Sequence, residues 1–376
     1  MRLLMVSGDR QVTIGERGPF HSMQREFSRH FERVDVLCPR PEGTVVVRTI
    51  HDNVHFHPAD CSRWRMVGYI ARRGRELIEA HGHTLIVSHD YGWFYNGLGS
   101  ARLAKATGVP YLSELHHVPG HPVAAGLGER LEFVLARAYI GWADKRAAAF
   151  RVVNGGEMPE LLGRWGVAPQ RVLVLPSLYI DLDVFRPEPD EEIEQDLCVV
   201  GRMVGNKGLE RIVDALALCR EHGRAATALF VGKGPLEAPL RARAAHLGLS
   251  DAVRFVRWVD SPANLARVYR ASRAMVCAST CEGGPRVTVE AMACGTPVVS
   301  TPVGVMGELL ADGRAGRLCG FDVASLAGAV EEVLGDEEAR SAMGAHAVEV
   351  AGRFEYARAI GVYAEGLQTL AGGGRR

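Results

Sequence analysis

Short apolar runs alternate with amphipathic stretches along the first half of the chain. Runs rich in Val, Ile and Leu that end at Gly, Pro or polar residues are typical of strands, whereas apolar positions three or four residues apart indicate helices. The expected strands are residues 3–6, 34–37, 45–49, 54–56, 85–88, 110–115, 151–153 and 172–175. The expected helices are residues 20–30, 98–107 and 130–150.

The same alternation restarts after residues 187–190, Pro-Glu-Pro-Asp, a rigid acidic segment that indicates an interdomain linker. Further strands are expected at residues 196–200, 228–231, 253–256, 274–278, 297–300 and 316–318, and helices at 209–221, 239–247, 262–271 and 288–293. Strands that alternate with helices predict parallel β-α-β units. The sequence therefore predicts an α/β protein with two Rossmann-like, doubly wound domains facing across a cleft.

The domain boundaries follow from this restart and from the length of 376 residues, which exceeds what one hydrophobic core usually supports. We expect an N-terminal domain over residues 1–190 and a C-terminal domain over residues 191–355. Residues 356–376 are expected to form a helix that packs back on the N-terminal domain, with a frayed Gly-Gly-Gly-Arg-Arg end.

Composition excludes several classes of protein. Lys plus Arg and Asp plus Glu both number 44, a balance that argues against a nucleic-acid binder. The first residues lack the pattern of a secretory signal, and no apolar run approaches the roughly 20 residues of a membrane span. The eight cysteines are scattered without a C-x-x-C pair. A soluble protein of the reducing cytoplasm is expected.

The loop at residues 201–208, Gly-Arg-Met-Val-Gly-Asn-Lys-Gly, follows an expected strand and precedes an expected helix. In open parallel sheets, ligands bind at this end of the strands. Glycines permit a tight turn, and a helix N-terminus favours an anion. Arg202 and Lys207 add two cations, so the loop suits a diphosphate. The alternative is a surface turn with two solvated charges.

Two carboxylates, Glu282 and Glu290, flank the start of a later expected helix. Carboxylate oxygens accept hydrogen bonds from vicinal hydroxyls of a ribose or hexose. The loop between them exposes backbone N–H groups at a helix start, where a phosphate is favoured. On their own, the two residues are equally consistent with a loop side chain and a satisfied helix end.

The combination of these motifs resembles family 4 of the retaining glycosyltransferases, which have the GT-B architecture. The resemblance rests on residues 201–208, on the Gly-Lys-Gly-Pro turn at 232–235, and on Glu282 followed by Glu-Ala-Met-Ala-Cys-Gly-Thr-Pro at 290–297. Residues 304–308, 312–316 and 353–356 match further motifs of the family. Nearly all of residues 196–356 is covered, while the N-terminal half matches in rhythm and at the Gly15 loop, His116 and a few other positions.

The resemblance implies a role for each matching residue. Arg202 and Lys207 would hold the donor diphosphate, Glu290 the ribose hydroxyls, and Glu282 the sugar hydroxyls. His116 would lie near the sugar and the leaving phosphate. The C-terminal domain would bind the donor and the N-terminal domain the acceptor, with residues 15–17, His89-Asp90 and His116-His117 as its candidate lining at strand carboxyl ends. The implied donor-binding set is Gly15, Gly201, Arg202, Lys207, Gly232, Gly234, Glu282, Gly283, Gly284, Arg286, Val287 and Glu290, with His116, Arg202, Lys207 and Glu282 as catalytic residues. No cofactor and no metal is implied, only a UDP- or GDP-type sugar as substrate.

The chain departs from the family pattern at three places. Residues 176–179, Pro-Ser-Leu-Tyr, replace a common Asn-Gly before the linker. His117 replaces a common Gly, and Trp258 stands where a small residue is frequent. The geometry of the hinge and the shape of the base pocket are therefore expected to differ from those of other members.

Three other patterns have competing interpretations. Asp181 and Asp183 form a D-x-D, but its place in the approach to the linker disfavours a metal site. His51, His55 and His57 could suggest a metal site, but their alternating strand positions favour a polar surface face. Residues 61–75 hold five Arg and no acid, so they form either a helix that covers the core or wall of the acceptor cleft, or a peripheral contact with anionic lipid, chiefly through residues 63–75.

Three functions compete at this stage. A glycosyltransferase would move a hexose-type sugar to a glycan, lipid or small-molecule acceptor. The alternatives are a GT-B sugar-nucleotide epimerase and a non-catalytic nucleotide-sugar binder. The joint presence of Arg202, Lys207, Glu282 and Glu290 favours the first.

Overall fold

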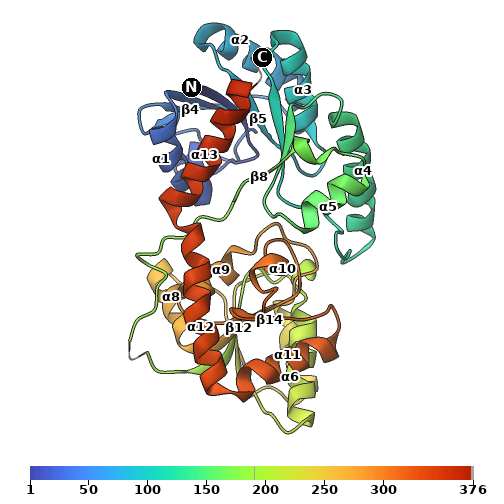
Figure 1. The fold of residues 1–376 in the computed structure, drawn as a ribbon, viewed down its shortest axis with the longest axis vertical. Helices are drawn as coiled ribbons and strands as arrows, with labels where there is room; N and C mark the ends of the chain where they lie inside the picture. The colour runs from blue at the N-terminus through green and yellow to red at the C-terminus, as the bar shows by residue number, and fades with distance from the viewer. Residues whose placement is uncertain (190, 374–376) are drawn as a thin grey trace.

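The computed structural model describes residues 1–189 and 191–373. Asp190, the last residue of the expected linker, and residues 374–376 of the terminal Gly-rich segment lie outside the described residues. Two α/β lobes follow one another along the long axis of the molecule, each with its own sheet (Figure 1). The expected fold class of two Rossmann-like sheets is confirmed.

The N-terminal lobe is built on eight strands in the order β3-β4-β2-β1-β5-β6-β7-β8. The strands are β1 (Arg2–Val6), β2 (Arg33–Cys38), β3 (Thr49–Ile50), β4 (Val54–Pro58), β5 (Leu85–His89), β6 (Tyr111–Leu115), β7 (Ala149–Val152) and β8 (Val172–Val174). The helices are η1 (Val12–Ile14), α1 (Pro19–His30), η2 (Arg63–Arg65), α2 (Met66–His81), α3 (Tyr95–Thr107), α4 (Leu127–Ala143), α5 (Glu157–Arg164) and η3 (Pro169–Arg171). All pairings are parallel except that of β3 with β4. The carboxyl ends of β1, β5 and β6 consequently meet at one edge.

The C-terminal lobe has six parallel strands in the order β11-β10-β9-β12-β13-β14. The strands are β9 (Gln195–Val200), β10 (Ala228–Val231), β11 (Val253–Val256), β12 (Ser272–Cys277), β13 (Val298–Ser300) and β14 (Gly316–Leu318). The helices up to residue 351 are η4 (Gly205–Lys207), α6 (Leu209–Glu221), α7 (Glu237–His246), α8 (Pro262–Arg270), α9 (Arg286–Ala293), α10 (Met306–Leu309), α11 (Val323–Gly335) and α12 (Glu337–Ala351). The strand order reverses direction between β9 and β12, and ligands of open α/β sheets bind at such a point.

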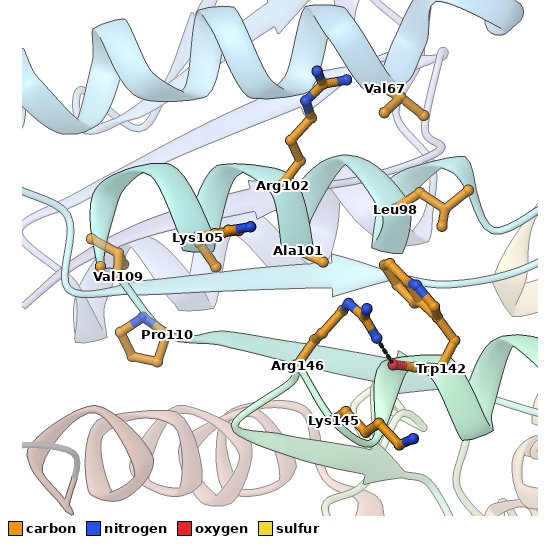
Figure 2. A pocket seen from close by; sticks show the side chains of 12 residues that line it. Val67, Leu98, Ala101, Arg102, Lys105, Val109, Pro110, Trp142, Lys145 and Arg146 are labelled. Carbon is orange, nitrogen blue, oxygen red and sulfur yellow. Dashed lines mark hydrogen bonds between the residues drawn. The ribbon is translucent and has the colours of Figure 1, made fainter.

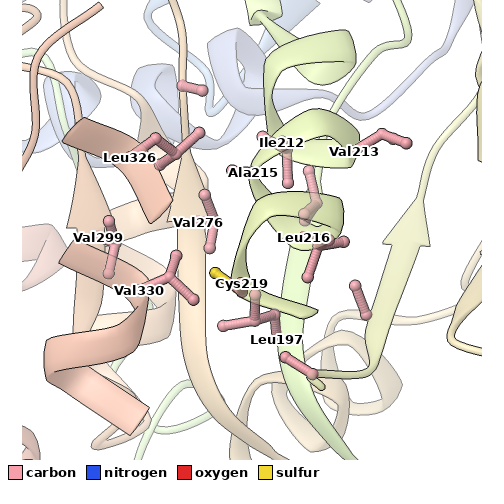
Figure 3. Packing of buried hydrophobic residues seen from close by; sticks show 14 of the residues in the cluster. Leu197, Ile212, Val213, Ala215, Leu216, Cys219, Val276, Val299, Leu326 and Val330 are labelled. Atoms are coloured by element: carbon pink, nitrogen blue, oxygen red, sulfur yellow. The ribbon is translucent and has the colours of Figure 1, made fainter. Parts of the chain in front are cut away.

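Apolar side chains from α6 and α11 fill one face of this second sheet. Figure 3 shows Ile212 and Leu216 of α6 and Val330 of α11 directed towards Val276 of β12. Each of these side chains is at most 2% exposed. Full burial of an aliphatic side chain stabilises by roughly 1.5–3 kcal/mol, so this layer fixes the strand ends that carry the donor motifs.

The two last helices connect the lobes along one side of the molecule (Figure 1). After α12 and η5 (Gly352–Phe354), helix α13 (Tyr356–Gly373) packs against α1 in the N-terminal lobe. Ile360, Tyr363 and Leu367 of α13 belong to the same buried cluster as Phe27 of α1. Between the sheets, the backbone of Ile180 pairs with Glu355, beside the start of α13.

Two predicted elements are wrong. The expected helix over residues 130–150 ends at Ala143, because residues 149–152 form β7 and pair with β6. Pairing in the sheet and full burial of Phe150 outweigh the helix propensity of this Ala-rich run. The expected strand over residues 45–49 is reduced to Thr49–Ile50, because the backbone N–H groups of Val46 and Val47 bind the carbonyl of Thr13 instead of a strand.

The Arg-rich segment begins with η2 and continues as α2. Met66 and Ile70 of α2 are fully buried, so this helix covers the core of the N-terminal lobe. Trp64 in η2 is 75% exposed. Within the described residues, no helix combines the length and apolar character needed to cross a membrane.

Candidate active site

Two glycine turns form the floor of the expected donor site. Gly201 follows β9 and Gly232 follows β10, with φ angles of 150° and 145°. A Cβ on Gly232 would overlap the carbonyl of Gly201, and a Cβ on Gly234 would overlap the backbone of Met203. Only glycine allows these neighbouring turns to lie so close together. The sequence motifs at 201 and 232 therefore belong to a single surface.

Lys207 and Glu282 meet beside these turns. Lys207 ends η4, and its Nζ forms an ion pair with Glu282 Oε1. Glu282 also accepts a hydrogen bond from Ser279 Oγ at 3.0 Å. Gly208, which directly follows Lys207, has φ 60° and lies against the Ala278 carbonyl, where a side chain would not fit. The ion pair between Lys207 and Glu282 therefore places a cation and a carboxylate side by side in the site.

Arg202 and Glu290 line a cavity of about 460 Å³ next to the glycine turns. Glu290 accepts hydrogen bonds from Arg286 Nε at 2.8 Å and from the hydroxyl of Tyr269 at 3.1 Å. Burial raises the pKa of Glu290. Trp258, which is 73% exposed, forms one wall of the same cavity. The cavity thus joins the aromatic face of Trp258, the carboxylate of Glu290 and the guanidinium of Arg202.

His116 lies directly after β6 and faces the C-terminal lobe. Its backbone carbonyl packs so closely on Gly283 that a Cβ there would overlap it. Two residues on, the carbonyl of Val118 accepts a hydrogen bond from Cys281 Sγ at 3.3 Å. Part of His116 remains accessible to solvent. The protein packed around the ring desolvates it, and this desolvation and the charge of Arg151 hold the pKa of His116 well below its usual range. The imidazole is therefore uncharged at neutral pH.

A buried charge network supports the end of β6. Glu114, fully enclosed, pairs with Arg151 Nη1 at 2.9 Å and lies 2.9 Å from His89 Nε2. The hydroxyl of Tyr363 on α13 also binds Glu114. Burial alone would raise the pKa of Glu114, but the charges of Arg151 and His89 hold it well below its usual range. Sequence reasoning missed Arg151 and Tyr363, since their partners lie 37 and 249 residues away.

Two carboxylates that the sequence interpretation also missed join the lobes. Glu308 of α10 accepts hydrogen bonds from the backbone N–H groups of Gly155 and Gly156 at 2.6 and 2.8 Å. In the opposite direction, Glu157 of α5 accepts a hydrogen bond from the backbone N–H of Gly304 at 2.6 Å. Each lobe thus places a carboxylate at a helix start of the other, where backbone N–H groups lack partners. We name these two contacts the carboxylate latch.

Most of the expected donor-binding residues lie close to one another in the structure, whereas Gly15 lies apart from them. Gly201, Arg202, Lys207 and Val287 line one small cavity, and Arg286 and Glu290 extend the set into the 460 Å³ cavity. Gly283 and Gly284 lie beside them, Gly284 against Leu178. Gly15 instead ends η1 in an exposed turn, where Val46 is its neighbour.

The residues weighed as metal ligands form local structure. Asp181 accepts a hydrogen bond from the backbone N–H of Asp183 at 3.1 Å, which is a turn. His57 lies 2.7 Å from Asp35, a fully buried carboxylate, so it is part of a core network as well as of the polar strand face. In the part of the chain that the structure describes, no group of three potential ligand residues is arranged to hold a metal.

A larger cavity, of about 700 Å³, lies away from the motif residues, in the N-terminal lobe. Figure 2 shows Arg102 and Lys105 on α3 across from Lys145 and Arg146, which follow α4. Arg146 Nη1 donates to the carbonyl of Trp142 at 2.7 Å. None of the expected donor residues lines this cavity, so size does not identify the active site here.

Family models match both halves of the chain. The description "Glycosyl transferases group 1" matches residues 183–350, and "Glycosyl transferase 4-like domain" matches residues 20–177. A D-inositol 3-phosphate glycosyltransferase of Acidothermus cellulolyticus is 33% identical over 306 residues, which are 75% of this chain and 67% of the relative. One named D-inositol 3-phosphate glycosyltransferase 2, from Catenulispora acidiphila, is 34% identical over 312 residues, 75% and 71% of the two chains.

Solved structures share the fold over the whole chain. HepE of Anabaena, in complex with UDP and glucose, has a TM-score of 0.75 at 19% identity and covers 98% of this chain and 100% of its own. A sucrose-phosphate synthase of Thermosynechococcus elongatus has a TM-score of 0.78 at 20% identity, with 99% of each chain covered. At such identities the likeness concerns the fold alone. Together with the two family models and the relatives, it shows that the chain belongs to family 4 of the glycosyltransferases, enzymes with the GT-B fold.

Proposed function

We propose that the protein transfers a hexose-type sugar, with retention, from a nucleoside-diphosphate sugar to an acceptor hydroxyl. The observation that carries this proposal is the convergence of Arg202, Lys207, Glu282 and Glu290 around the glycine turns. Each supplies a group that a nucleotide sugar needs, namely two cations for the diphosphate and two carboxylates for hydroxyls. UDP is the favoured nucleotide, because HepE, which has the same fold, was solved with UDP and glucose.

The cavity beside Arg202 suits a nucleoside. Its wall includes Trp258, on whose face a base can stack, and Val200 and Leu265 add apolar area. Glu290 would accept hydrogen bonds from the ribose in place of those from Arg286 and Tyr269. Arg286, which forms an ion pair with Glu290, would then be free to contact the diphosphate.

Catalysis would rest on the charge that develops as the donor splits. The bond between the anomeric carbon and the diphosphate oxygen breaks, and its electron pair stays on the nucleoside diphosphate. The acceptor oxygen bonds to the same face of the anomeric carbon and gives its proton to the leaving phosphate. Arg202 and Lys207 stabilise the new negative charge, and fixed cations lower such a barrier most where water is excluded. The neutral His116 donates a hydrogen bond near the sugar or leaving phosphate.

Nucleoside diphosphate release with and without acceptor tests the proposal. UDP- and GDP-sugars are first ranked by the rise in melting temperature that they cause, because a ligand of the folded state stabilises it by mass action. Turnover is then measured with an acceptor panel, before and after exhaustive treatment with EDTA. Acceptor-dependent release that survives EDTA supports a metal-independent transferase. Conversion of the donor to its epimer without net release of nucleoside diphosphate supports the epimerase. Binding without release or conversion supports the non-catalytic binder, and loss reversed by Mg²⁺ or Mn²⁺ contradicts metal independence.

We also propose that residues 63–65 touch an anionic membrane surface from the cytoplasmic side. The side chain of Trp64 is exposed beside Arg63, whose guanidinium lies 5.1 Å from the indole ring centre. Further along, Arg73 and Arg75 of α2 are paired with glutamates, which leaves the first turn as the basic part. Sedimentation with vesicles of phosphatidylglycerol and of phosphatidylcholine tests this. Trp64→Ala should weaken binding to the anionic vesicles only, and equal binding to both lipids would contradict it.

A further inference from the structure

A second cavity, of about 340 Å³, lies at the carboxyl ends of β1, β5 and β6 in the N-terminal lobe. Its lining consists of Ser7, Gly8, Asp9, His89, Asp90, Tyr91, Glu114, His116, His117 and Pro119. His116 belongs to this cavity and also contacts Gly283 of the donor loop. The cavity therefore adjoins the point where the donor sugar would lie, which is the place for the acceptor.

The side chains that line this cavity are acidic in composition. Of the described residues that line it, none is a lysine or arginine, while Asp9, Asp90 and Glu114 carry carboxyl groups. Asp9 is held by the backbone N–H groups of Gln11 and Val12, each 3.1 Å from Oδ1. Burial raises the pKa of Asp9 and raises that of Asp90 to about 7, because desolvation disfavours a charged group, and the same desolvation disfavours an anionic ligand here.

The cations around this lining are already engaged. Arg151 is 2% exposed and pairs with Glu114 at 2.9 Å, and two of its other N–H groups donate to the carbonyls of Leu175 and Pro176. Lys207, whose charge acts on His117, is paired with Glu282. Arg10, which follows Asp9, pairs with Glu42 at 3.2 Å. Its guanidinium is thus drawn to another carboxylate, and neither arginine offers a free charge to a ligand in the cavity.

The histidines add no positive charge that is free to meet an anionic ligand. His89 Nε2 lies 2.9 Å from the buried Glu114, which engages it. His116 is uncharged at neutral pH because its pKa is held well below the usual range, and burial also lowers the pKa of His117. Uncharged imidazoles both donate and accept hydrogen bonds, as hydroxyl groups do. Carboxylates accept hydrogen bonds from hydroxyls. The lining is thus matched to a ligand rich in hydroxyl groups and repels an anion.

We infer that the acceptor is an uncharged polyhydroxylated molecule, such as a free cyclitol or sugar, and not a phosphate monoester. The inference rests on the proposed function and specifies its acceptor. It separates this chain from relatives whose names specify D-inositol 3-phosphate. A phosphate monoester carries between one and two negative charges near neutral pH and needs Arg or Lys partners. In the transfer, one acceptor hydroxyl loses its proton to the leaving phosphate as its oxygen bonds to the anomeric carbon.

Matched acceptor pairs test this inference. Nucleoside diphosphate release is measured with myo-inositol against inositol 3-phosphate, glucose against glucose 6-phosphate, and mannose against mannose 6-phosphate. We expect kcat/KM to be higher for a neutral member, by roughly tenfold or more, since like charges at close range cost at least this much in partly buried sites. Transfer confined to phosphorylated members, or absent from every neutral one, overturns the inference. Calorimetric binding of nucleoside diphosphate in the same samples shows separately whether the donor site of the proposed function holds.

A charge variant makes the test independent of the acceptor panel. Asp9→Asn keeps an oxygen for the N–H groups of Gln11 and Val12 but removes one negative charge. We expect the preference for neutral acceptors to shrink by roughly three- to tenfold, chiefly through kcat/KM of the phosphorylated members. Asp251→Asn, an exposed position in the C-terminal lobe, makes the same change in net charge and should leave the preference unaltered. Equal effects of the two variants would contradict a local role of charge in the cavity.

Discussion

Arg202 and Lys207 share a loop but differ in their surroundings. Lys207 is paired with Glu282, whereas the exposed Arg202 has no ion-pair partner within the described residues. Both would face the diphosphate, where negative charge develops as the donor splits. In the proposed mechanism, the donor would replace the ion pair between Lys207 and Glu282 with contacts to the substrate.

We predict that Arg202→Ala and Lys207→Ala each lower kcat by roughly 10²–10³-fold, because a fixed cation at a developing charge is worth this much. Melting temperatures should change little, since neither side chain is buried in the core. Arg102→Ala and Lys105→Ala, at the remote cavity of Figure 2, are the matched controls and should keep full turnover. Near-normal kcat in both loop variants would remove these residues from the proposed mechanism.

A variant at His116 tests whether the nucleotide is bound by the C-terminal lobe alone while the N-terminal lobe contributes to catalysis. Its side chain projects from the N-terminal lobe, whereas the nucleotide would be held by the C-terminal one. We predict that His116→Ala strongly lowers kcat and leaves the Kd of the free nucleoside diphosphate nearly unchanged. Titration calorimetry alongside turnover assays measures both. If affinity falls as far as kcat, His116 has a structural role in the contact with Gly283.

The proposed donor residues can be picked from the sequence because most of them lie in short loops, at 201–208, 232–235 and 282–290. On the acceptor side, the ends of expected strands already indicate His89-Asp90 and His116-His117. Asp9 joins them only because β1 lies beside β5 in the folded sheet. The signal for Asp9 was present in its place after the first strand. Nothing local marks Arg151, whose partner Glu114 is defined by the pairing of β6 with β7.

At the scale of elements, the expected strands and helices match the structure where the local sequence pattern and the tertiary contacts favour the same conformation. Helix α6 spans Leu209–Glu221 as expected, with its apolar side under α11. The run from 130 to 150 fails because Ala-rich residues suit a helix in isolation, while the sheet requires β7 there. Helix α13 is likewise stabilised by contacts between residues far apart in the sequence, because its buried side chains pack against the N-terminal lobe.

We predict that Leu367→Ala in α13 lowers the free energy of unfolding by about 2–5 kcal/mol, as for other buried leucines. Leu367 is fully buried against the N-terminal lobe. Val362→Ala on the same helix removes an apolar side chain that is 46% exposed, and should cost under about 0.5 kcal/mol. Urea unfolding monitored by circular dichroism compares the two. Equal midpoints would show that α13 adds little to the stability of that lobe.

At the scale of the whole molecule, the lobes are joined by α13 and by the carboxylate latch. The latch joins α5 to α10, which lie towards the other side of the molecule from α13 in Figure 1. Glycosyl transfer needs the cleft to admit a donor and release a nucleoside diphosphate. A contact of a few hydrogen bonds suits such a motion, because each contributes only about 0.5–1.5 kcal/mol in net terms.

The latch should also make the stability of the molecule depend on pH. Burial raises the pKa of Glu157 from 4.5 to about 7, despite the N–H of Gly304. A carboxyl group whose pKa is raised on folding stabilises the folded state at low pH, and this contribution is lost as pH rises from 4.5 through about 7. Glu157→Gln keeps an oxygen for Gly304 and does not ionise. We predict that its melting temperature rises relative to that of the wild type between pH 5 and pH 8. Glu160→Gln, exposed on the same helix, should follow the wild-type curve. Parallel curves for Glu157→Gln and the wild type would mean that Glu157 ionises freely, and that the latch opens without regard to pH.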